Sequence, residues 1–192
     1  MKINNHPPIY QQVISSPVGN LKLQASEYGL THLQVLQDSV ANDTLTNAQL
    51  QTDGVADAFV TELSAIEPSV VERERAKAYV TQAVTELGQY FKGERQTFDV
   101  KLAAKGTEFQ HQVWHALTEL NFGEICSYAA IADKIVRPKA VRAVGAANGA
   151  NPIAIIVPCH RVIGKNGSLT GYAYGLEMKQ YLLNLEGVNT EK

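Results

Sequence analysis

"SYAAIADKIVRPKAVRAVGAANGAN", residues 127–151, is the stretch of the sequence that decides the fold. Ser127 can cap a short helix whose isoleucines share one face. Pro138 then breaks the chain and suits the first turn of a second helix, which ends at Gly149. Helix, short turn, helix is the outline of a helix-turn-helix, although many helical hairpins share it. The stretch therefore predicts a mainly helical C-terminal half.

The second of these helices has unusually small side chains. Ala143, Gly145, Ala146 and Ala147 are almost continuous, although glycine inside a helix costs about 1 kcal/mol relative to alanine. Small side chains let a backbone come close to another helix or to a nucleic-acid groove. Arg142 is the one long cationic side chain between residues 141 and 149, so it is the natural arm toward a partner.

The stretch "IAIIVPCHRVIG", residues 153–164, follows directly. Its apolar start predicts a strand over 153–157, which Pro158 bends or ends. Cys159 comes next, and a neighbouring base or positive charge raises the thiolate fraction of a cysteine. His160 follows at once, so Cys159 is either a histidine-assisted nucleophile or a buried structural cysteine beside an incidental histidine.

The rest of the chain gives a coarse order of elements. We expect a β-meander over 9–37, a loose connection with a short helix over 38–69, a helix over 70–92, a strand over 97–102, a helix opening at the N-cap Thr107, a hairpin turn at Asn166-Gly167, and a last helix ending at Gly187.

The composition is that of an ordinary soluble globular protein, with 192 residues of which 45% are hydrophobic and 19% charged. The N-terminal residues contain no secretory signal, and no apolar run is long enough to cross a membrane. Two cysteines make neither a disulfide framework nor a cysteine-rich zinc site, so we expect a cytoplasmic protein with reduced thiols. Cys126 is expected to be a small core residue.

Charge is distributed unevenly along the chain. The net charge is −2, yet residues 134–176 contain no Asp or Glu and six basic residues: Lys134, Arg137, Lys139, Arg142, Arg161 and Lys165. Such a segment is either the footprint of a phosphate backbone or a solvated basic face.

His111 and His115 lie four residues apart on the expected helix, as metal ligands often do. No third ligand follows in the manner of an HExxH motif, so we expect two surface or partly packed histidines. The sequence thus predicts no metal site and no cofactor.

"NPIAIIVPCHRVIG", with the preceding "SYAAIADKI" and "RAVGAANGANP", resembles the active-site region of the O6-alkylguanine-DNA alkyltransferases, also called methylated-DNA–protein-cysteine methyltransferases. The resemblance covers the C-terminal half, including "GTEFQHQVWHAL", "FGEICSYAAIA" and "KQYLLNLEG". It extends more weakly to "SSPVGNLKLQAS" and "YFKGERQTFDV". The four-cysteine zinc domain of the inducible members has no counterpart here, which implies the constitutive type.

This resemblance implies two domains. Residues 1–102 would form an α/β domain with a ribonuclease H-like small antiparallel sheet. Residues 103–192 would form a mainly helical, winged helix-turn-helix-like domain that binds DNA and accepts the alkyl group.

The implied function is DNA repair by direct reversal. The protein would act as a monomer, would need no cofactor and would not bind a membrane. It would bind alkylated double-stranded DNA in the minor groove and flip the damaged base out. It would transfer the alkyl group of O6-alkylguanine, and of O4-alkylthymine, to Cys159 once and irreversibly.

Site roles carry over from the family residue by residue. Cys159 would be the acceptor, His160 would take its proton through a water, and Glu186 would orient the imidazole. Tyr128 would assist flipping and donate a hydrogen bond to guanine, and Arg142 would fill the vacated stack. The other DNA-binding residues would be Ala143, Ala147 and Asn148, and the base pocket would consist of Asn151, Pro152, Tyr172 and Ala173.

Some positions depart from the family pattern. Tyr174 and Ala173 differ from many relatives in the pocket loop and bear on the range of alkyl groups, while Asn148 and Gly149 replace bulkier residues.

Two other functions compete with this one. A DNA-binding regulator or lesion sensor would not need Cys159. A Cys-His hydrolase would need an oxyanion site and would not explain the helix-turn-helix.

Overall fold

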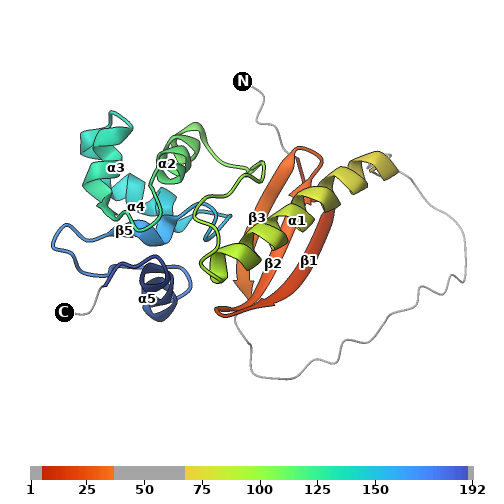
Figure 1. Cartoon of the computed structure of the whole chain (residues 1–192). Coiled ribbons are helices and arrows are strands. Elements are labelled where there is room, and N and C mark those ends of the chain that lie inside the picture. The colour runs from red at the N-terminus through yellow and green to blue at the C-terminus, as the bar shows by residue number, and fades with distance from the viewer. Residues whose placement is uncertain (1–5, 37–67, 190–192) are drawn as a thin grey trace, which may run out of the picture.

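The computed structural model describes residues 6–36 and 68–189. A small sheet covered by one long helix forms the N-terminal half, and a group of shorter helices lies beside it (Figure 1). Most of the connection expected over 38–69 lies outside the described residues.

The sheet consists of β1 (Tyr10–Ser16), β2 (Gly19–Ser26) and β3 (Gly29–Leu36), antiparallel in the order β1-β2-β3. This confirms the expected meander. Gly29 has φ 148°, and a Cβ there would lie 2.5 Å from the carbonyl oxygen of Lys101. Only glycine lets the chain of the interdomain connection run so close to the start of β3.

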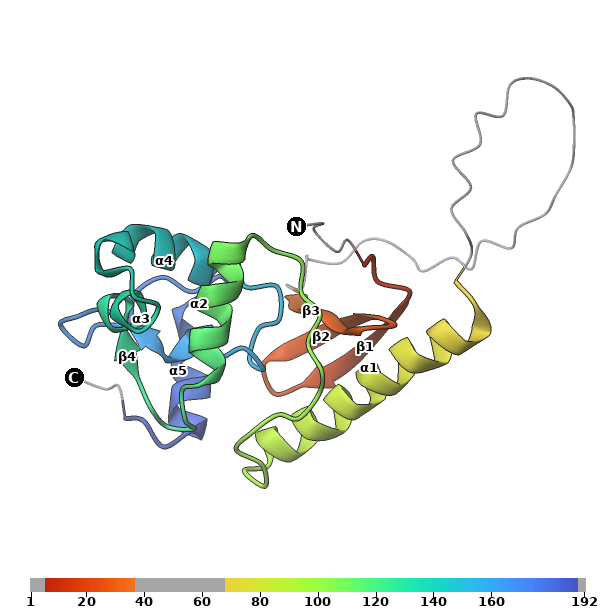
Figure 2. The same ribbon diagram turned by 90° about the horizontal axis from the view of Figure 1, so that it is seen from above.

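Helix α1 (Val70–Phe91) lies across one face of the sheet (Figure 2). Ser69 and Glu72 form a reciprocal capping box at its N-terminus. Its buried stripe packs onto the sheet and includes Ala76, Val80, Ala83, Leu87 and Tyr90. The helix expected over 70–92 is therefore confirmed.

The strand expected over 97–102 is wrong. That segment makes one isolated bridge, between Leu30 and Leu102, and otherwise runs irregularly toward the C-terminal half. The buried carboxylate of Glu86 accepts hydrogen bonds from the backbone N–H groups of Asp99 and Val100. These amides are satisfied by a side chain on α1, so no neighbouring strand is needed.

The C-terminal half contains the predicted helix-turn-helix. The motif consists of α3 (Tyr128–Lys134), capped by Ser127, and α4 (Val141–Gly149), with a 3₁₀ turn (Pro138–Ala140) between them. Helix α2 (Glu108–Thr118), capped by Thr107, precedes it. Helix α5 (Leu176–Leu185) closes the domain, and β4 (Cys126–Ser127) pairs in parallel with β5 (Val162–Ile163). Both predicted N-caps, Thr107 and Ser127, are confirmed.

The strand expected over 153–157 is also wrong. The segment folds into tight turns, in which Ile156 N–H donates to the Ala154 carbonyl at 2.8 Å and Val157 N–H to the Ile153 carbonyl at 3.0 Å. Ile155 is fully buried and has φ 70°, a left-handed conformation that is costly for a β-branched residue. The apolar run is therefore core, but it is not strand.

A turn forms at Asn166-Gly167, but the expected hairpin does not. Gly164 N–H donates to the Ser168 carbonyl at 2.9 Å, and Gly167 has φ 80°. The strand before this turn, β5, pairs with β4 and leaves the turn without a second arm.

The two halves share one core and are joined by backbone hydrogen bonds. Leu33 of β3 donates its N–H to the Pro152 carbonyl at 2.9 Å, and its carbonyl accepts from Ala154 at 3.1 Å. The edge of the N-terminal sheet thus fixes the segment that leads into Cys159.

Candidate active site

Cys159 begins a single 3₁₀ turn, Cys159–Arg161, between Pro158 and β5. The residue is only 5% exposed, and its N–H donates to the Val157 carbonyl at 2.8 Å. On a regular strand, Cys159 and His160 would point to opposite faces. The turn removes that restriction, and strained Ile155 lies just before it.

Asn151 holds this turn through both ends of its amide. Its Nδ2 donates to the Val157 carbonyl at 2.8 Å and contacts Cys159 Sγ at 3.1 Å. Its Oδ1 accepts from Ile153 N–H at 3.0 Å. One side chain therefore fixes the backbone before Cys159 and supplies a donor to its sulfur.

The thiol is not acidic on its own. Burial raises the pKa of Cys159, while the hydrogen bond from Asn151 and the charge of Lys179 act in the opposite direction without overcoming it. Lys179 lies fully buried on α5 and donates to the carbonyls of Val162 at 2.6 Å and Thr170 at 2.7 Å. Burial lowers the pKa of Lys179 to about 8. A nucleophile at Cys159 therefore needs a base to take its proton.

His160 can serve as this base. It is fully buried, and its Nε2 lies 2.8 Å from Glu186 Oε1. Because a carboxylate only accepts, Nε2 carries the proton, and Nδ1 is left buried without a hydrogen-bond partner among the described residues. Burial lowers the pKa of His160 more strongly than Glu186 raises it, so the ring is a neutral base with an open Nδ1.

Glu186 follows α5 and lies at the centre of the buried polar network. Arg161 donates Nε to Oε2 at 2.8 Å and Nη2 to Oε1 at 2.9 Å, and Gly123 N–H also donates to Oε2. Burial alone would raise the pKa of Glu186, but hydrogen bonds and charges from His160 and Arg161 lower it to about 2. The carboxylate therefore stays ionised and holds the imidazole in one tautomer.

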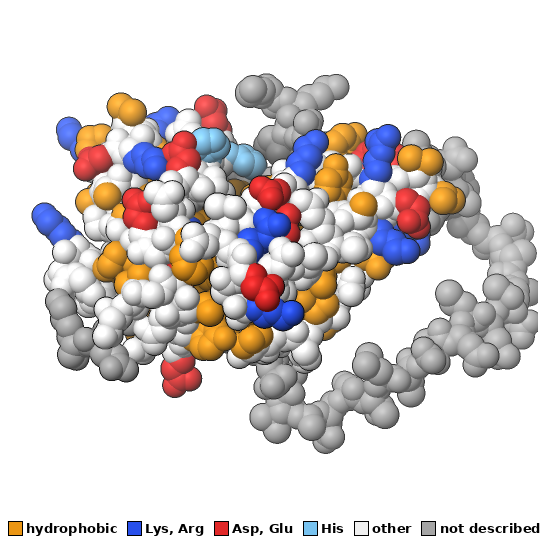
Figure 3. Space-filling model, in the orientation of Figure 1, with side chains coloured by type: hydrophobic (Ala, Val, Ile, Leu, Met, Phe, Trp, Pro, Cys, Tyr) orange, Lys and Arg blue, Asp and Glu red, His pale blue; other side chains and the backbone are white. Residues whose placement is uncertain are grey.

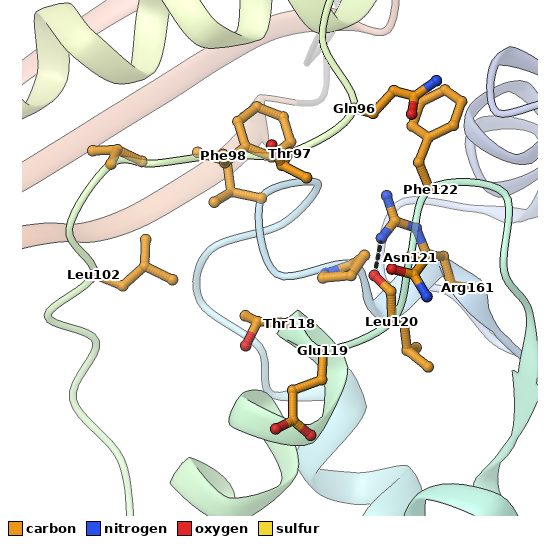
Figure 4. Close-up of a pocket in the computed structure, with 13 residues that line it drawn as sticks. Gln96, Thr97, Phe98, Leu102, Thr118, Glu119, Leu120, Asn121, Phe122 and Arg161 are labelled. Carbon is orange, nitrogen blue, oxygen red and sulfur yellow. Dashed lines mark hydrogen bonds between the residues drawn. The ribbon is translucent and has the colours of Figure 1, made fainter.

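Arg161 links this network to the domain boundary. Its Nη1 donates to the Leu120 carbonyl at 2.7 Å, on the wall of a cavity of about 270 Å³ between the halves (Figure 4). Arg161 is one of the six basic residues of the segment for which the sequence allows either a phosphate footprint or a solvated basic face. The structure buries it, whereas the other five, Lys134, Arg137, Lys139, Arg142 and Lys165, are exposed.

The helix-turn-helix presents part of the predicted DNA-binding set on its outside. Arg142 and Ala143 are exposed at the start of α4, and Tyr128 is half-buried at the start of α3. Gly145 faces Tyr128, since a Cβ at Gly145 would lie 3.8 Å from the tyrosine ring.

Ala147 and Asn148 were expected on the same DNA-binding face, but the structure buries both. The Ala147 carbonyl accepts from Trp114 Nε1 at 2.8 Å, and Asn148 Nδ2 donates to the Cys159 carbonyl at 3.4 Å. They lie three and four residues after buried Val144, on the inner stripe of α4. Through Asn148, this inner stripe contacts the turn that contains Cys159.

Of the predicted base-pocket residues, the structure places Asn151 and Tyr172 beside the sulfur of Cys159. Asn151, Pro152 and Tyr172 are half-buried and Ala173 is exposed. The Tyr172 hydroxyl is buried beside Cys159 but is not aligned well enough for a regular hydrogen bond. Tyr174 packs edge-on against Tyr172 with ring centroids 5.7 Å apart.

The remaining candidates are the histidine pair on α2 and the second cysteine, Cys126. His111 and His115 are exposed, His115 Nδ1 lies 3.7 Å from Glu119, and residues 6–36 and 68–189 contain no group of three metal-ligating side chains. Burial, followed by the charge of Glu124, raises the pKa of Cys126 to about 11, which keeps this thiol protonated and unreactive.

Acidic and basic side chains are interspersed on the face shown in Figure 3, without a patch of one sign. None of the described helices is long and apolar enough to cross a membrane.

The fold and the site define a class of protein: a helix-turn-helix domain that holds a buried cysteine next to a histidine whose ring is bound to a carboxylate. Comparison with known families agrees. Residues 9–104 match the family model "6-O-methylguanine DNA methyltransferase, ribonuclease-like domain", and residues 108–188 match the corresponding "DNA binding domain". The chain belongs to the 6-O-methylguanine DNA methyltransferase family.

Relatives resemble the chain over nearly its full length. The methylated-DNA–protein-cysteine methyltransferase of Methanosarcina mazei is 45% identical, over 94% of this chain and 99% of the relative. That of Mycobacterium tuberculosis is 42% identical, over 93% and 92%. The crystal structure of Mycobacterium tuberculosis OGT in complex with DNA has a TM-score of 0.70 and 40% identity, over 93% of each chain. These matches confirm the predicted family and fold class.

Proposed function

We propose that this protein repairs DNA by direct reversal and transfers the alkyl group of O6-alkylguanine to Cys159. The observation that carries the proposal is the buried Cys159 thiol followed directly in the chain by buried His160, whose Nε2 is held by Glu186 and whose Nδ1 has no partner among the described residues. The name shared by the relatives, methylated-DNA–protein-cysteine methyltransferase, supports the same reaction.

The chemistry is a displacement at the alkyl carbon. The thiol proton passes to His160 Nδ1 through one water, and Sγ attacks the carbon as its bond to O6 breaks. Tyr128 donates a proton to the guanine ring as the base leaves. The resulting thioether is stable, so each molecule acts once and the protein is consumed as a reagent.

The substrate has to leave the duplex before it can reach Cys159, since a stacked base cannot present its O6-alkyl carbon to a buried sulfur. We assign entry into the minor groove to exposed Arg142 and Ala143 on α4, with Arg142 filling the vacated stack. Tyr128 assists the rotation of the base. Ala147 and Asn148, which the structure buries, support α4 and the acceptor turn from the inside.

The extruded base would lie against Tyr172, Pro152 and Ala173, with Asn151 holding the acceptor turn. Tyr174 beside Tyr172 narrows this loop and favours small alkyl groups such as methyl. O4-alkylthymine is proposed as a second substrate because it offers the same alkyl ether on a smaller base.

We propose that the acting form is a monomer, since Cys159, His160 and Glu186 need no residue of a second chain for the proposed reaction. We propose residues 1–102 as the N-terminal domain and residues 103–192 as the DNA-binding and acceptor domain, which act in the cytoplasm where the thiol stays reduced.

The test uses Cys159→Ala with a duplex that carries O6-methylguanine. The variant should bind the duplex as the unmodified protein does, within about threefold, and leave the lesion methylated. If the unmodified protein instead hydrolyses ester substrates over many turnovers, it is a hydrolase. Binding by the unmodified protein without loss of the methyl group from DNA would identify a lesion sensor.

A further inference from the structure

Tyr90, in the last turn of α1, connects the N-terminal half to the acceptor network. Its side chain is fully buried, and its hydroxyl donates to Glu186 Oε1 at 2.8 Å, across 96 residues of sequence. Helix α1 covers the N-terminal sheet and lies away from the helix-turn-helix (Figures 1 and 2). A side chain of this half therefore contacts the carboxylate that holds His160.

The tyrosine ring is held in place by aromatic neighbours from both halves. Its centroid lies 5.5 Å from Phe91, 5.4 Å from Phe98 and 6.1 Å from Phe122. Phe98 and Phe122 also line the cavity between the halves (Figure 4). Because the ring is fixed on several sides, the direction of its O–H bond toward Glu186 is set by packing before any substrate arrives.

Glu186 Oε1 accepts from three donors: the Tyr90 hydroxyl, His160 Nε2 and Arg161 Nη2. Burial, reinforced by the Glu186 charge, raises the pKa of Tyr90, so the phenol stays protonated and its hydroxyl remains a donor to the carboxylate. A donor that shares Oε1 with His160 draws charge away from the imidazole and makes the ring a weaker base.

The other charged groups around this pair are fixed. Arg161 contacts the carboxylate directly, Lys179 acts on His160 and Cys159 through its charge, and Tyr181 acts weakly on Tyr90. Among these contacts, the Tyr90 hydrogen bond is the one that joins α1 to the site.

We infer that Tyr90 is a positioning residue through which the N-terminal half sets the orientation and basicity of the Glu186–His160 pair. This inference rests on the proposed function, since it concerns the base that deprotonates Cys159. It gives the N-terminal half, which carries no reacting group in the proposed mechanism, a defined part in the transfer.

The experiment compares Tyr90→Phe with Tyr79→Phe. Tyr79 lies on the same helix, is half-buried against the same core, and makes no side-chain hydrogen bond within the described ranges, so it is the matched control. Methyl transfer from duplex O6-methylguanine is followed as a single-turnover rate against pH, and binding to the Cys159→Ala versions is measured alongside.

Tyr90→Phe should lower the transfer rate at neutral pH about three- to tenfold with unchanged DNA affinity, since a hydrogen bond to a charged group is lost. It should also move the acid limb of the pH profile to higher pH, because His160 keeps its proton longer when Oε1 is shared less. Tyr79→Phe should change neither quantity. A Tyr90→Phe profile that overlays that of the unmodified protein would overturn the inference.

Two further variants guard against a general loss of folding. Fluorotyrosine at position 90 keeps the ring and hydroxyl, is a stronger donor, and should move the acid limb to lower pH. In a Glu186→Gln background, Tyr90→Phe should change the rate less than about twofold, because residues that act through one group are not additive. A full additional loss in that background, or a limb that fluorotyrosine leaves in place, would contradict the inference.

A DNA-free measurement separates this inference from the proposed function. Alkylation of Cys159 by iodoacetamide, followed by peptide mass, reports the thiol and its base without any lesion. If the unmodified protein fails to take methyl groups from DNA, the proposed function fails. If it takes them but the iodoacetamide profile of Tyr90→Phe is unshifted, the Tyr90 inference alone fails.

Discussion

Asn151 Nδ2 lies 3.1 Å from Cys159 Sγ and 2.8 Å from the Val157 carbonyl oxygen, so a single amide group holds both the sulfur and its loop. The loop needs such an anchor because it contains Ile155 in a left-handed conformation, which the surrounding contacts have to hold. Stability and reactivity are therefore coupled at this residue.

Asn151→Ala should lower the free energy of unfolding by about 1–3 kcal/mol, since a buried carbonyl and amide lose their partners. It should also raise the pKa of Cys159, because a donor to the sulfur is lost. Urea unfolding and the pH dependence of iodoacetamide labelling measure the two effects. Asn184→Ala, at an exposed position on α5, is the control and should leave both unchanged. A change below about 0.5 kcal/mol for Asn151→Ala would contradict the anchoring role.

Arg142 is expected to matter only when a base has to leave a duplex. Arg142→Ala should slow transfer from duplex O6-methylguanine by about tenfold or more. Flipping the base costs a few kcal/mol, and without the arginine no side chain fills the vacated stack to offset part of that cost. Transfer from the free O6-methylguanine base should stay the same, because nothing needs to be flipped. Single-turnover rates on both substrates check this, and an equal loss on both would place Arg142 in the reaction itself.

Val136, in the turn between α3 and α4, is 85% exposed and has φ 58°. A β-branched residue gains nothing from burial there and is strained in this conformation, whereas asparagine tolerates it. Val136→Asn should raise the free energy of unfolding by about 1 kcal/mol. Val71→Asn, at an exposed position in the first turn of α1, should not stabilise the protein. Urea unfolding distinguishes the two, and destabilisation by Val136→Asn would mean that the valine makes a stabilising contact.

Acid should weaken the fold through the site itself. The pKa of Glu186 is about 2 in the folded protein against an ordinary 4.5, so its stabilisation is present above that ordinary value and is lost as the pH falls toward 2. The pKa of buried His160 is also below its ordinary 6.5. The free energy of unfolding therefore falls as the pH drops below 6.5, because the unfolded state binds this proton before the folded state does. Unfolding by urea from neutral pH down to about pH 3 should show a steady loss of stability, and this slope should be shallower in Glu186→Gln.

Local sequence signals predicted much of this structure. The helix-turn-helix followed from Ser127, Pro138 and Gly149, because caps and helix breakers act over a few residues. Cys159 and His160 stood out because a thiol and an imidazole interrupt an apolar run. The apolar run 153–157 predicts a strand, but periodicity shows only that residues are buried and cannot show that they fold as tight turns.

What the sequence could not show are the contacts between distant segments. Tyr90 reaches Glu186 across 96 residues, and Arg161 turns inward to the same carboxylate although both readings of its basic segment, a phosphate footprint or a solvated face, place it outside. The burial of Ala147 and Asn148 was within reach, however. Both follow the inward-facing Val144 at helical spacing and so share its face.

The most direct test of the acceptor role of Cys159 is the mass of the intact protein after incubation with an excess of duplex DNA carrying O6-methylguanine. We predict the addition of one methyl group per molecule, located on the peptide that contains Cys159, with no further addition as the excess of DNA grows. A protein whose mass stays unchanged while the lesion disappears, or one methylated elsewhere than at Cys159, would contradict the account.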